Sequence, residues 1–389
     1  MSKPQIRFKG FEDEWEIAPF KSLCTYTASN LTATDAMQSG KYPLFDANKF
    51  IGFTDLAHIN KSYISIIKDG AGVGRVRALP KDSFIIGTLG ALVPNDNSLI
   101  TFLLPLTSIQ NFASHNSGST IPHIYFSQYG ESLVAFPNTT EQGNIGDFFK
   151  QIDEMITEVE REVSRLEKMK QASLQKMFPR PGATAPEIRF NGFSSKWRKC
   201  KLSELLTQRI EHQKITDEEP LLAFSYAEGV INPDDKKSNK RDFLMTDKFN
   251  KIFSRTEVDD IIYNPANVIH GAIHRNTLKT GVVSPIYKIF RCNEDISPKY
   301  MGVRLRTSSF ISEIFKYIEG TVIKLRTLSP YSFLNMEIDI PESIAEQDYI
   351  GEYFYKLDNL ISAKRQKLVK LRDIKQACLD KMFVNTSDL

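Results

Sequence analysis

The sequence has few cysteines and no long apolar run. Its 389 residues include four cysteines, which lie far apart and form no CxxC pair. This spacing argues against a disulfide framework and against a structural zinc site. The N-terminal segment MSKPQIRFKG has no apolar signal core, and no run reaches the ~18 apolar residues of a membrane helix. These absences predict a soluble protein of the reducing cytoplasm, without a membrane partner.

The sequence also lacks a strong excess of charge of either sign. The formal net charge is +3 and the sequence pI is about 8.4. Such a balance neither requires nor excludes nucleic acid, so any DNA-facing basic surface must be local. Hydrophobic residues make up 41% of the chain, which is enough to build the cores of two domains in a protein of this length.

One long segment occurs twice. Residues 141–178 and 346–383 align without a gap, from Glu141-Gln142 and Glu346-Gln347 to a shared Lys-Met-Phe ending. Such an internal duplication organises the whole chain and has to be interpreted before the fold.

Each copy is predicted to be a long amphipathic helix. Apolar residues recur at alternating spacings of three and four, which is the heptad seam of a coiled coil. In the first copy the seam consists of Phe149, Ile152, Ile156, Val159, Val163 and Leu166. In the second it contains Phe354, Leu357, Ile361, Leu368 and Leu371.

The two helices differ in charge at their middles. Glutamates gather near the middle of the first helix (Glu154, Glu158, Glu160, Glu162), and cations near the middle of the second (Lys364, Arg365, Lys367, Lys370, Arg372). Because the midpoints of equal helices meet in an antiparallel pair, we expect the helices to pack on each other in opposite directions. About 33 residues would make a rod of roughly 50 Å. The alternative is that each is a charged, solvated helix without a partner.

A second repeat precedes each half. PQIRFKGFEDEW at residues 4–15 returns as PEIRFNGFSSKW at residues 186–197, ending in Trp15 and Trp197. Each half therefore consists of this lead-in motif, a globular segment and a long helix. Several prolines between the halves predict a helix end followed by a stiff linker at 179–185.

The two globular segments do not visibly repeat each other in sequence. Both show short strand-like runs separated by Gly, Asn and Pro turns, including 63–67, 84–87, 261–263 and 282–290, with a helical patch at 309–318. The fold class predicted is α+β: two mixed, strand-rich domains separated by two antiparallel coiled-coil helices, with a pseudo-twofold internal repeat.

Three motifs suggest chemistry but are incomplete. The glycine-rich turn 69–74 superficially suggests a nucleotide loop, yet Pro80 and a strand follow it rather than a helix, so a plain turn is favoured. Asn264-Pro265-Ala266-Asn267 is similar to the Asn-Pro-Pro-Tyr loop of amino-methyltransferases, but Asn267 replaces the aromatic residue that would stack on a flipped base. His270 and His274 have the spacing of metal ligands on a helix, but no third ligand is evident. We therefore predict neither catalytic nor metal-binding residues.

Basic residues give the candidates for DNA contact. The densest run holds Lys236, Lys237, Lys240 and Arg241, and a solvated loop is the alternative reading of such a run. Lys324 and Arg326 follow the turn at Gly320, and Arg75 and Arg77 follow the glycine-rich turn.

The whole pattern resembles the DNA specificity subunit of a Type I restriction-modification enzyme. The resemblance rests on the two motifs ending in tryptophan, the variable segments and the two Glu-Gln helices that end in Lys-Met-Phe. It implies target recognition domains at 1–140 and 186–345, spacer helices at 141–178 and 346–383, and a C-terminal tail to residue 389. It also matches the turns at 118–122 and 320–326 to a recurrent segment of these domains, which adds Ser119 and Thr120 to the DNA-contact candidates.

The resemblance further implies partners. The expected partners are double-stranded DNA with a bipartite site, two methylase subunits and the restriction subunits. The chain itself would bind no cofactor, since S-adenosylmethionine, Mg and ATP would belong to those subunits, and it would have no catalysis of its own. Two alternatives remain open: an adaptor that binds only proteins through its coiled coil, and a self-sufficient DNA adenine methyltransferase.

Overall fold

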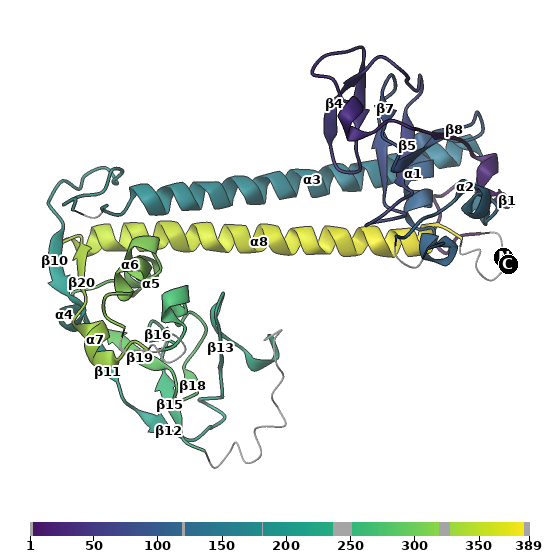
Figure 1. Cartoon of the computed structure of the whole chain (residues 1–389). Helices are drawn as coiled ribbons and strands as arrows, with labels where there is room; N and C mark the ends of the chain where they lie inside the picture. Colours follow the sequence, from purple (N-terminus) through teal and green to yellow (C-terminus); the bar gives the residue numbers. More distant parts are fainter. Residues whose placement is uncertain (1–2, 119–120, 181, 236–250, 319–326, 385–389) are drawn as a thin grey trace. The chain divides into compact units, whose positions relative to one another are not determined.

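The chain folds into two compact units. A computed structural model describes residues 3–118, 121–180, 182–235, 251–318 and 327–384. The first unit consists of Met1–Arg161 and Arg365–Leu389, and the second of Glu162–Lys364. Each unit contains one globular module together with a segment of each long helix (Figure 1). Within the described residues no helix is both long and apolar enough to cross a membrane.

The first module is built on a four-stranded antiparallel sheet with the order β2-β8-β5-β6. These strands are β2 (Cys24–Ala28), β8 (Leu89–Pro94), β5 (Tyr63–Ile67) and β6 (Val76–Leu79). A smaller sheet combines β4 (Phe50–Thr54), β3 (Tyr42–Phe45) and β7 (Phe84–Ile85), and β1 (Glu16–Pro19) pairs with β9 (Leu133–Phe136). The short helices are α1 (Ile100–Ser108) and α2 (Phe126–Tyr129). All five residues of β5 are buried, as expected for a central strand covered on both faces.

The second module repeats the four-stranded sheet and the outer strand pair, but its three-stranded sheet is wholly antiparallel, whereas β3 and β7 of the first module pair in parallel. Its four-stranded antiparallel sheet has the order β11-β19-β16-β17. These strands are β11 (Leu206–Arg209), β19 (Lys288–Cys292), β16 (Ile261–Tyr263) and β17 (Ile273–Arg275). A three-stranded sheet joins β12 (His212–Gln213), β15 (Phe253–Thr256) and β18 (Gly281–Val283), and β10 (Arg198–Lys201) pairs with β20 (Glu337–Ile340). The two modules thus share a scaffold that their sequences do not visibly share.

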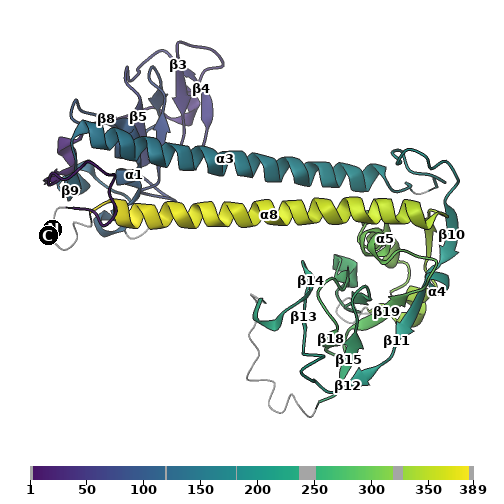
Figure 2. The same ribbon diagram turned by 180° about the vertical axis from the view of Figure 1, so that it is seen from behind.

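The remaining elements of the second module are short. They are α4 (Leu202–Leu205), α5 (Pro298–Arg304), α6 (Ser308–Ile314) and α7 (Pro330–Leu334), with the hairpin of β13 (Ala223–Ser225) and β14 (Gly229–Ile231) (Figure 2). The run 282–290, expected as one strand, is two strands, because a turn closed by the amide of Tyr287 on the carbonyl of Ser284 interrupts it. The helical patch expected at 309–318 is α6, which ends earlier, at Ile314.

The long helices are α3 (Thr139–Lys176) and α8 (Ile344–Met382). Both begin two residues before the segments that the repeat defined. The most buried seam residues lie in the N-terminal parts and middles of the two helices and are 0–6% exposed: Phe149, Ile152, Val159, Phe354, Leu357 and Ile361. The other seam positions, Ile156, Val163, Leu166, Leu368 and Leu371, are half-buried.

In both units the two helices run antiparallel, as the charges predicted. In the first unit, Lys375 Nζ lies 2.6 Å from Asp153 Oδ1 and Arg372 Nη2 lies 2.6 Å from Glu160 Oε1. In the second unit, Lys364 Nζ lies 2.5 Å from Glu162 Oε2, and Lys170 pairs with Asp358. Such partly exposed pairs contribute only about 0.2–1 kcal/mol each, so burial of the seam stabilises the pair and the charges select its direction.

Each unit contains an aromatic cluster. The cluster includes the phenylalanine that follows the long helix of the other half of the repeat. In the first unit, Phe383 after α8 packs on Trp15, Phe102 and Phe149, with ring centroids 5.5–6.4 Å apart. In the second unit, Phe178 after α3 packs on Trp197, Tyr300 and Phe354 at 5.9–6.2 Å. The repeated Trp and Lys-Met-Phe endings therefore serve the same packing purpose twice.

Candidate nucleic-acid interface

A buried ion pair attaches the first module to α3. Glu141, in the first turn of the helix, is fully buried and accepts two hydrogen bonds from Arg7, at 2.7 Å from Nε and 2.8 Å from Nη2. The hydrogen bond to Glu141 raises the pKa of Arg7, so the arginine stays charged. Next to it, Gln142 accepts from the amide of Leu99 at 3.0 Å and donates to the carbonyl of Pro137 at 2.9 Å. We call these contacts the Arg-Glu-Gln lock.

The second unit repeats the lock. Arg189 donates to the fully buried Glu346 at 2.5 and 2.6 Å, and this bond raises the pKa of Arg189. Gln347 accepts from the amide of Ser297 at 2.8 Å and donates to the carbonyl of Pro341 at 2.9 Å. Each glutamine therefore joins three parts of its unit: the long helix, the strand before it and the start of a short module helix.

A glycine on each long helix permits close approach of the module. A Cβ added at Gly146 would lie 2.4 Å from Oγ1 of Thr101 in α1, and one added at Gly351 would lie 2.6 Å from the amide of Tyr300 in α5. Together with the lock, this contact fixes how each module sits on its own helix start. The sequence repeats contain these residues, but they did not predict that the arginines pair with the glutamates. The occurrence of both residues at equivalent places in the two halves was the available signal for this pairing.

The arginines predicted after the glycine-rich turn lie on the first module and donate to oxygen atoms of the turn between β3 and β4. Arg75 Nη2 donates to the carbonyl of Ala47 and to Oδ1 of Asn48, and Arg77 Nη2 donates to the carbonyl of Asp46. Both side chains thus lie against the β3–β4 turn, and Arg75 remains exposed. The turn itself leads into β6, not into a helix, as expected for a plain glycine turn.

The other predicted DNA contacts lie outside the described residues. They are Ser119, Thr120, Lys236, Lys237, Lys240, Arg241, Lys324 and Arg326. They stay predictions.

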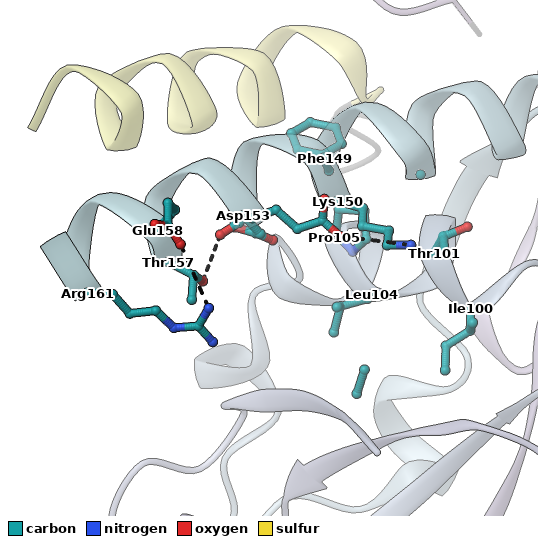
Figure 3. A pocket seen from close by; sticks show the side chains of 13 residues that line it. Ile100, Thr101, Leu104, Pro105, Phe149, Lys150, Asp153, Thr157, Glu158 and Arg161 are labelled. Carbon is teal, nitrogen blue, oxygen red and sulfur yellow. Dashed lines mark hydrogen bonds and ion pairs between the residues drawn. The ribbon is translucent and has the colours of Figure 1, made fainter. Parts of the chain in front are cut away.

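An apolar pocket of about 610 Å³ lies between the first module and α3 (Figure 3). Ile100, Leu104 and Pro105 of α1 form its apolar wall. Lys150, Glu154, Glu158 and Arg161 of α3 give it a charged rim. The mixture of signs on the rim does not favour a phosphate.

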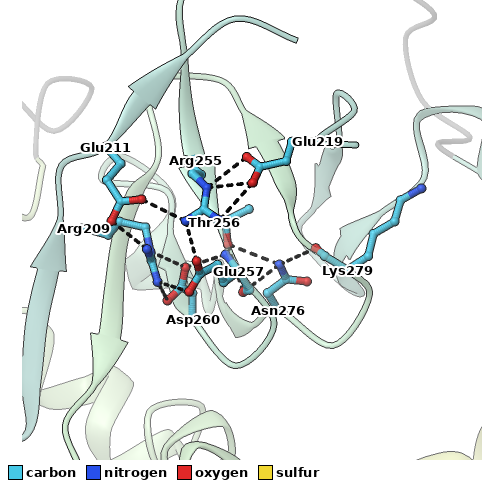
Figure 4. Close-up of polar contacts among 9 residues, drawn as sticks. All are labelled: Arg209, Glu211, Glu219, Arg255, Thr256, Glu257, Asp260, Asn276 and Lys279. Carbon is cyan, nitrogen blue, oxygen red and sulfur yellow. Dashed lines mark hydrogen bonds and ion pairs between the residues drawn. The ribbon is translucent and has the colours of Figure 1, made fainter. Parts of the chain in front are cut away.

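A network of arginines and carboxylates lies on β11, β15 and the adjoining segments of the second module (Figure 4). Arg209, with 4% of its side chain exposed, donates to Asp260, Glu211 and Glu257 at 2.7–3.2 Å. Arg255 pairs with the same Glu211 and Glu257 and with Glu219, and these hydrogen bonds lower the pKa of Glu257. Because carboxylates saturate both arginines, the network holds β11, β15 and their neighbours together rather than offering cations to DNA.

The histidine and asparagine motifs fall on separate elements. His270 ends a 3₁₀ turn and is exposed, whereas His274 is buried in β17 with its Nε2 2.9 Å from the carbonyl of Tyr226. Burial lowers the pKa of His274 to about 4. Across the described ranges, no cluster of three or more His, Cys, Asp or Glu side chains could hold a metal ion. Asn264 and Asn267 line a pocket below the β13–β14 hairpin.

The sequence was compared with known families. Residues 12–168 match the family described as the Type I restriction modification DNA specificity domain. The match covers the globular part of the first module and the lock of the first unit from Glu141 onward. Residues 12–168 thus carry a Type I restriction modification DNA specificity domain.

Two specificity subunits are similar to this chain over nearly its full length. The Type I restriction enzyme MjaVIII specificity subunit of Methanocaldococcus jannaschii is 22% identical, over 95% of this chain and 92% of that protein. The crystal structure of a Type I restriction-modification S subunit from M. genitalium superposes with a TM-score of 0.69 at 17% identity, covering 99% of this chain and 100% of that one. The predicted fold of two mixed modules and two long helices is therefore confirmed.

Proposed function

We propose that this chain is the DNA sequence-specificity subunit of a Type I restriction-modification complex. Its two modules would each recognise one half of a bipartite DNA site. The observation that carries the proposal is a structural duplication. Both units contain the same strand order in the four-stranded sheet, the same Arg-Glu-Gln lock and the same aromatic cluster.

This duplication favours sequence-specific DNA recognition over a role as an adaptor that binds only proteins. The parts that repeat in sequence attach each module to the helices, whereas the modules themselves share topology and differ in sequence. Two dissimilar readers on one scaffold fit a target with two different half-sites. A coiled-coil adaptor would need the helices but not two large, dissimilar modules.

The chemistry of the complex would lie on partner subunits. A methyltransferase needs a cofactor loop, and the chain's glycine-rich turn leads into a strand, while its Asn264–Asn267 loop lacks the stacking aromatic. Methylase subunits would bring S-adenosylmethionine, and restriction subunits would bring Mg and ATP. The specificity chain would bind DNA by phosphate contacts that position it and base contacts that select the sequence.

Exposed apolar side chains on the long helices fit the methylase partners. Met155 and Met169 of α3, and Val369 and Ile374 of α8, are 42–56% exposed on helices whose other faces pack on each other. Their apolar surface would be covered by helices of two methylase subunits, one for each half of the repeat.

Co-expression with the cognate methylase subunits, followed by mapping of methylated adenines across the host DNA at single-base resolution, tests the proposal. We expect one split motif with a fixed gap between its halves. A stable complex that methylates no DNA, or methylates it without sequence preference, would refute the specificity role and bring forward the protein-only adaptor.

A further inference from the structure

The second module contains an aromatic pocket that the scaffold role does not use. Its volume is about 580 Å³, within the range of about 300–1,000 Å³ that is typical of ligand sites. Phe224 and Tyr226 of the β13–β14 hairpin form one wall, and Asn264, Asn267 and Tyr287 complete it. We call these five residues the aromatic pocket.

The hairpin is fastened over the loop that follows β16. The hydroxyl of Tyr226 donates to the carbonyl of His270, and Nε2 of His274 meets the carbonyl of Tyr226 at 2.9 Å. Gly229 has φ +80°, and a Cβ there would lie 2.7 Å from that of His274, so the turn needs glycine to come this close. The pocket is thus bounded by two segments that are tied together.

The walls combine ring faces with unused polar groups. Phe224 is 6% exposed, and its ring packs on that of the half-buried Tyr287 with centroids 4.9 Å apart and a tilt of 36°, so Tyr287 supplies the accessible aromatic surface. Within the described residues, the side-chain amide of Asn267 and the Tyr287 hydroxyl form no hydrogen bond, and the Asn264 side chain makes one, accepting from the backbone amide of Ala266 at 3.0 Å. An apolar ligand would leave these side-chain amides unpaired, so the pocket suits a flat ring with hydrogen-bonding edges.

A second cavity, of about 210 Å³, shares Glu228 and adjoins the aromatic pocket. Three cations, Arg275, Lys299 and Arg306, line it together with two carboxylates, Glu228 and Asp358, so the cations are in excess. Asp259 pairs with Arg275 and Glu352 with Lys299, whereas Arg306 is exposed and forms no ion pair in the part of the chain that the structure describes. A cation next to an aromatic and amide-lined pocket matches a nucleotide, whose phosphate lies beside its base.

We propose that the aromatic pocket of the second module takes a nucleobase that has left the base stack of the bound DNA. The base lies against the half-buried ring of Tyr287, and the Asn264 and Asn267 side-chain amides pair with its edge, while Arg306 meets the neighbouring phosphate. This inference rests on the proposed function, because it needs DNA on the second module. It is separate from the adenine that the methylase subunits would extrude for methylation.

Binding to mismatched duplexes tests the inference. Extruding a base costs unpairing energy, and a mismatch opposite that base lowers this cost. The complex of the chain with its methylase subunits is titrated with its recognition duplex and with a set of duplexes that carry one mismatch each, through the second half-site and its flanks. We expect tighter binding, by about tenfold or more, at the methylated adenine and at one further position.

Variants assign the further position to the pocket. Asn267→Ala changes an exposed side chain, and Tyr287→Ala removes a wall; both should abolish the gain at the further position and keep the gain at the methylated adenine. Tyr331→Ala is the matched control, because Tyr331 is 79% exposed on α7 and does not line the pocket. It should keep both gains.

The outcomes separate the two proposals. Specific binding with a gain only at the methylated adenine, or a further gain that Asn267→Ala leaves intact, overturns the inference but not the specificity role. Absence of any preference for the recognition duplex overturns the specificity role itself. Failure of the Tyr287→Ala chain to bind the methylase subunits, when the Asn267→Ala complex keeps both gains, overturns the inference and assigns the pocket to a side chain of the partner.

Discussion

Breaking the lock of the second unit should destabilise that unit strongly. Arg189→Met leaves the fully buried Glu346 carboxylate without its partner. Removing one member of a buried pair costs about 3–5 kcal/mol, because the remaining charge stays desolvated. With a slope of about 1–3 kcal/mol per molar urea, the unfolding midpoint should fall by at least about 1 M.

The chain provides its own probes for this measurement. It contains two tryptophans, Trp15 in the first unit and Trp197 in the second. In a Trp15→Phe background, urea unfolding followed by fluorescence reports on Trp197, which is 5% exposed and lies in the aromatic cluster of the second unit.

Two further variants make the reasoning refutable. Arg189→Met combined with Glu346→Leu removes both charges and should recover most of the stability, since an apolar pair can replace a buried ion pair at little cost. Lys316→Met breaks the exposed pair with Glu313 and should cost no more than about 1 kcal/mol. If Arg189→Met costs no more than Lys316→Met, the lock does not hold the module.

Three other predictions concern pH, salt and the gap. The pKa of His274 is depressed to about 4, mainly by burial and also by the charges of Arg306 and Lys170, so the unfolded chain binds a proton more readily. Stability of the second unit should therefore be complete above about pH 6.5 and fall by up to about 3 kcal/mol as the pH drops to 4, as measured by urea unfolding of Trp197. Alanine at four cations should weaken DNA binding by the complex and reduce the slope of log affinity against log salt by about 0.9 for each phosphate that the variant no longer neutralises. These cations are Lys236, Lys237, Lys240 and Arg241. Matching insertions of one heptad in α3 and α8 should lengthen the gap of the recognised site, as read by methylation mapping.

Each of these predictions has a contrary result. His274→Leu should remove most of the pH dependence, and an unchanged profile in that variant would assign it to other groups. An unchanged salt slope in the fourfold alanine variant would mean that the basic run is a solvated loop. A gap of the original length after insertion would show that the helices do not set the spacing.

The sequence by itself determined the repeat, the position of both long helices and their relative direction. The gapless alignment of the two Glu-Gln segments located the helices, and their opposite charges indicated the antiparallel direction that Arg372–Glu160 and Lys364–Glu162 display. Sequence periodicity is sufficient to locate these helices because a heptad seam is a local pattern, in which each position is defined by neighbours three or four residues away.

Only the tertiary structure decided how the modules are held and what they offer to a ligand. Arg7 pairs with Glu141 across 134 residues and Arg189 with Glu346 across 157, distances over which no local pattern operates. The common sheet order of the modules was likewise invisible, because strand pairing depends on burial and register rather than on residue identity. The aromatic pocket joins the hairpin to the Asn264–Asn267 loop for the same reason: residues far apart in sequence meet only once the sheet has brought them together.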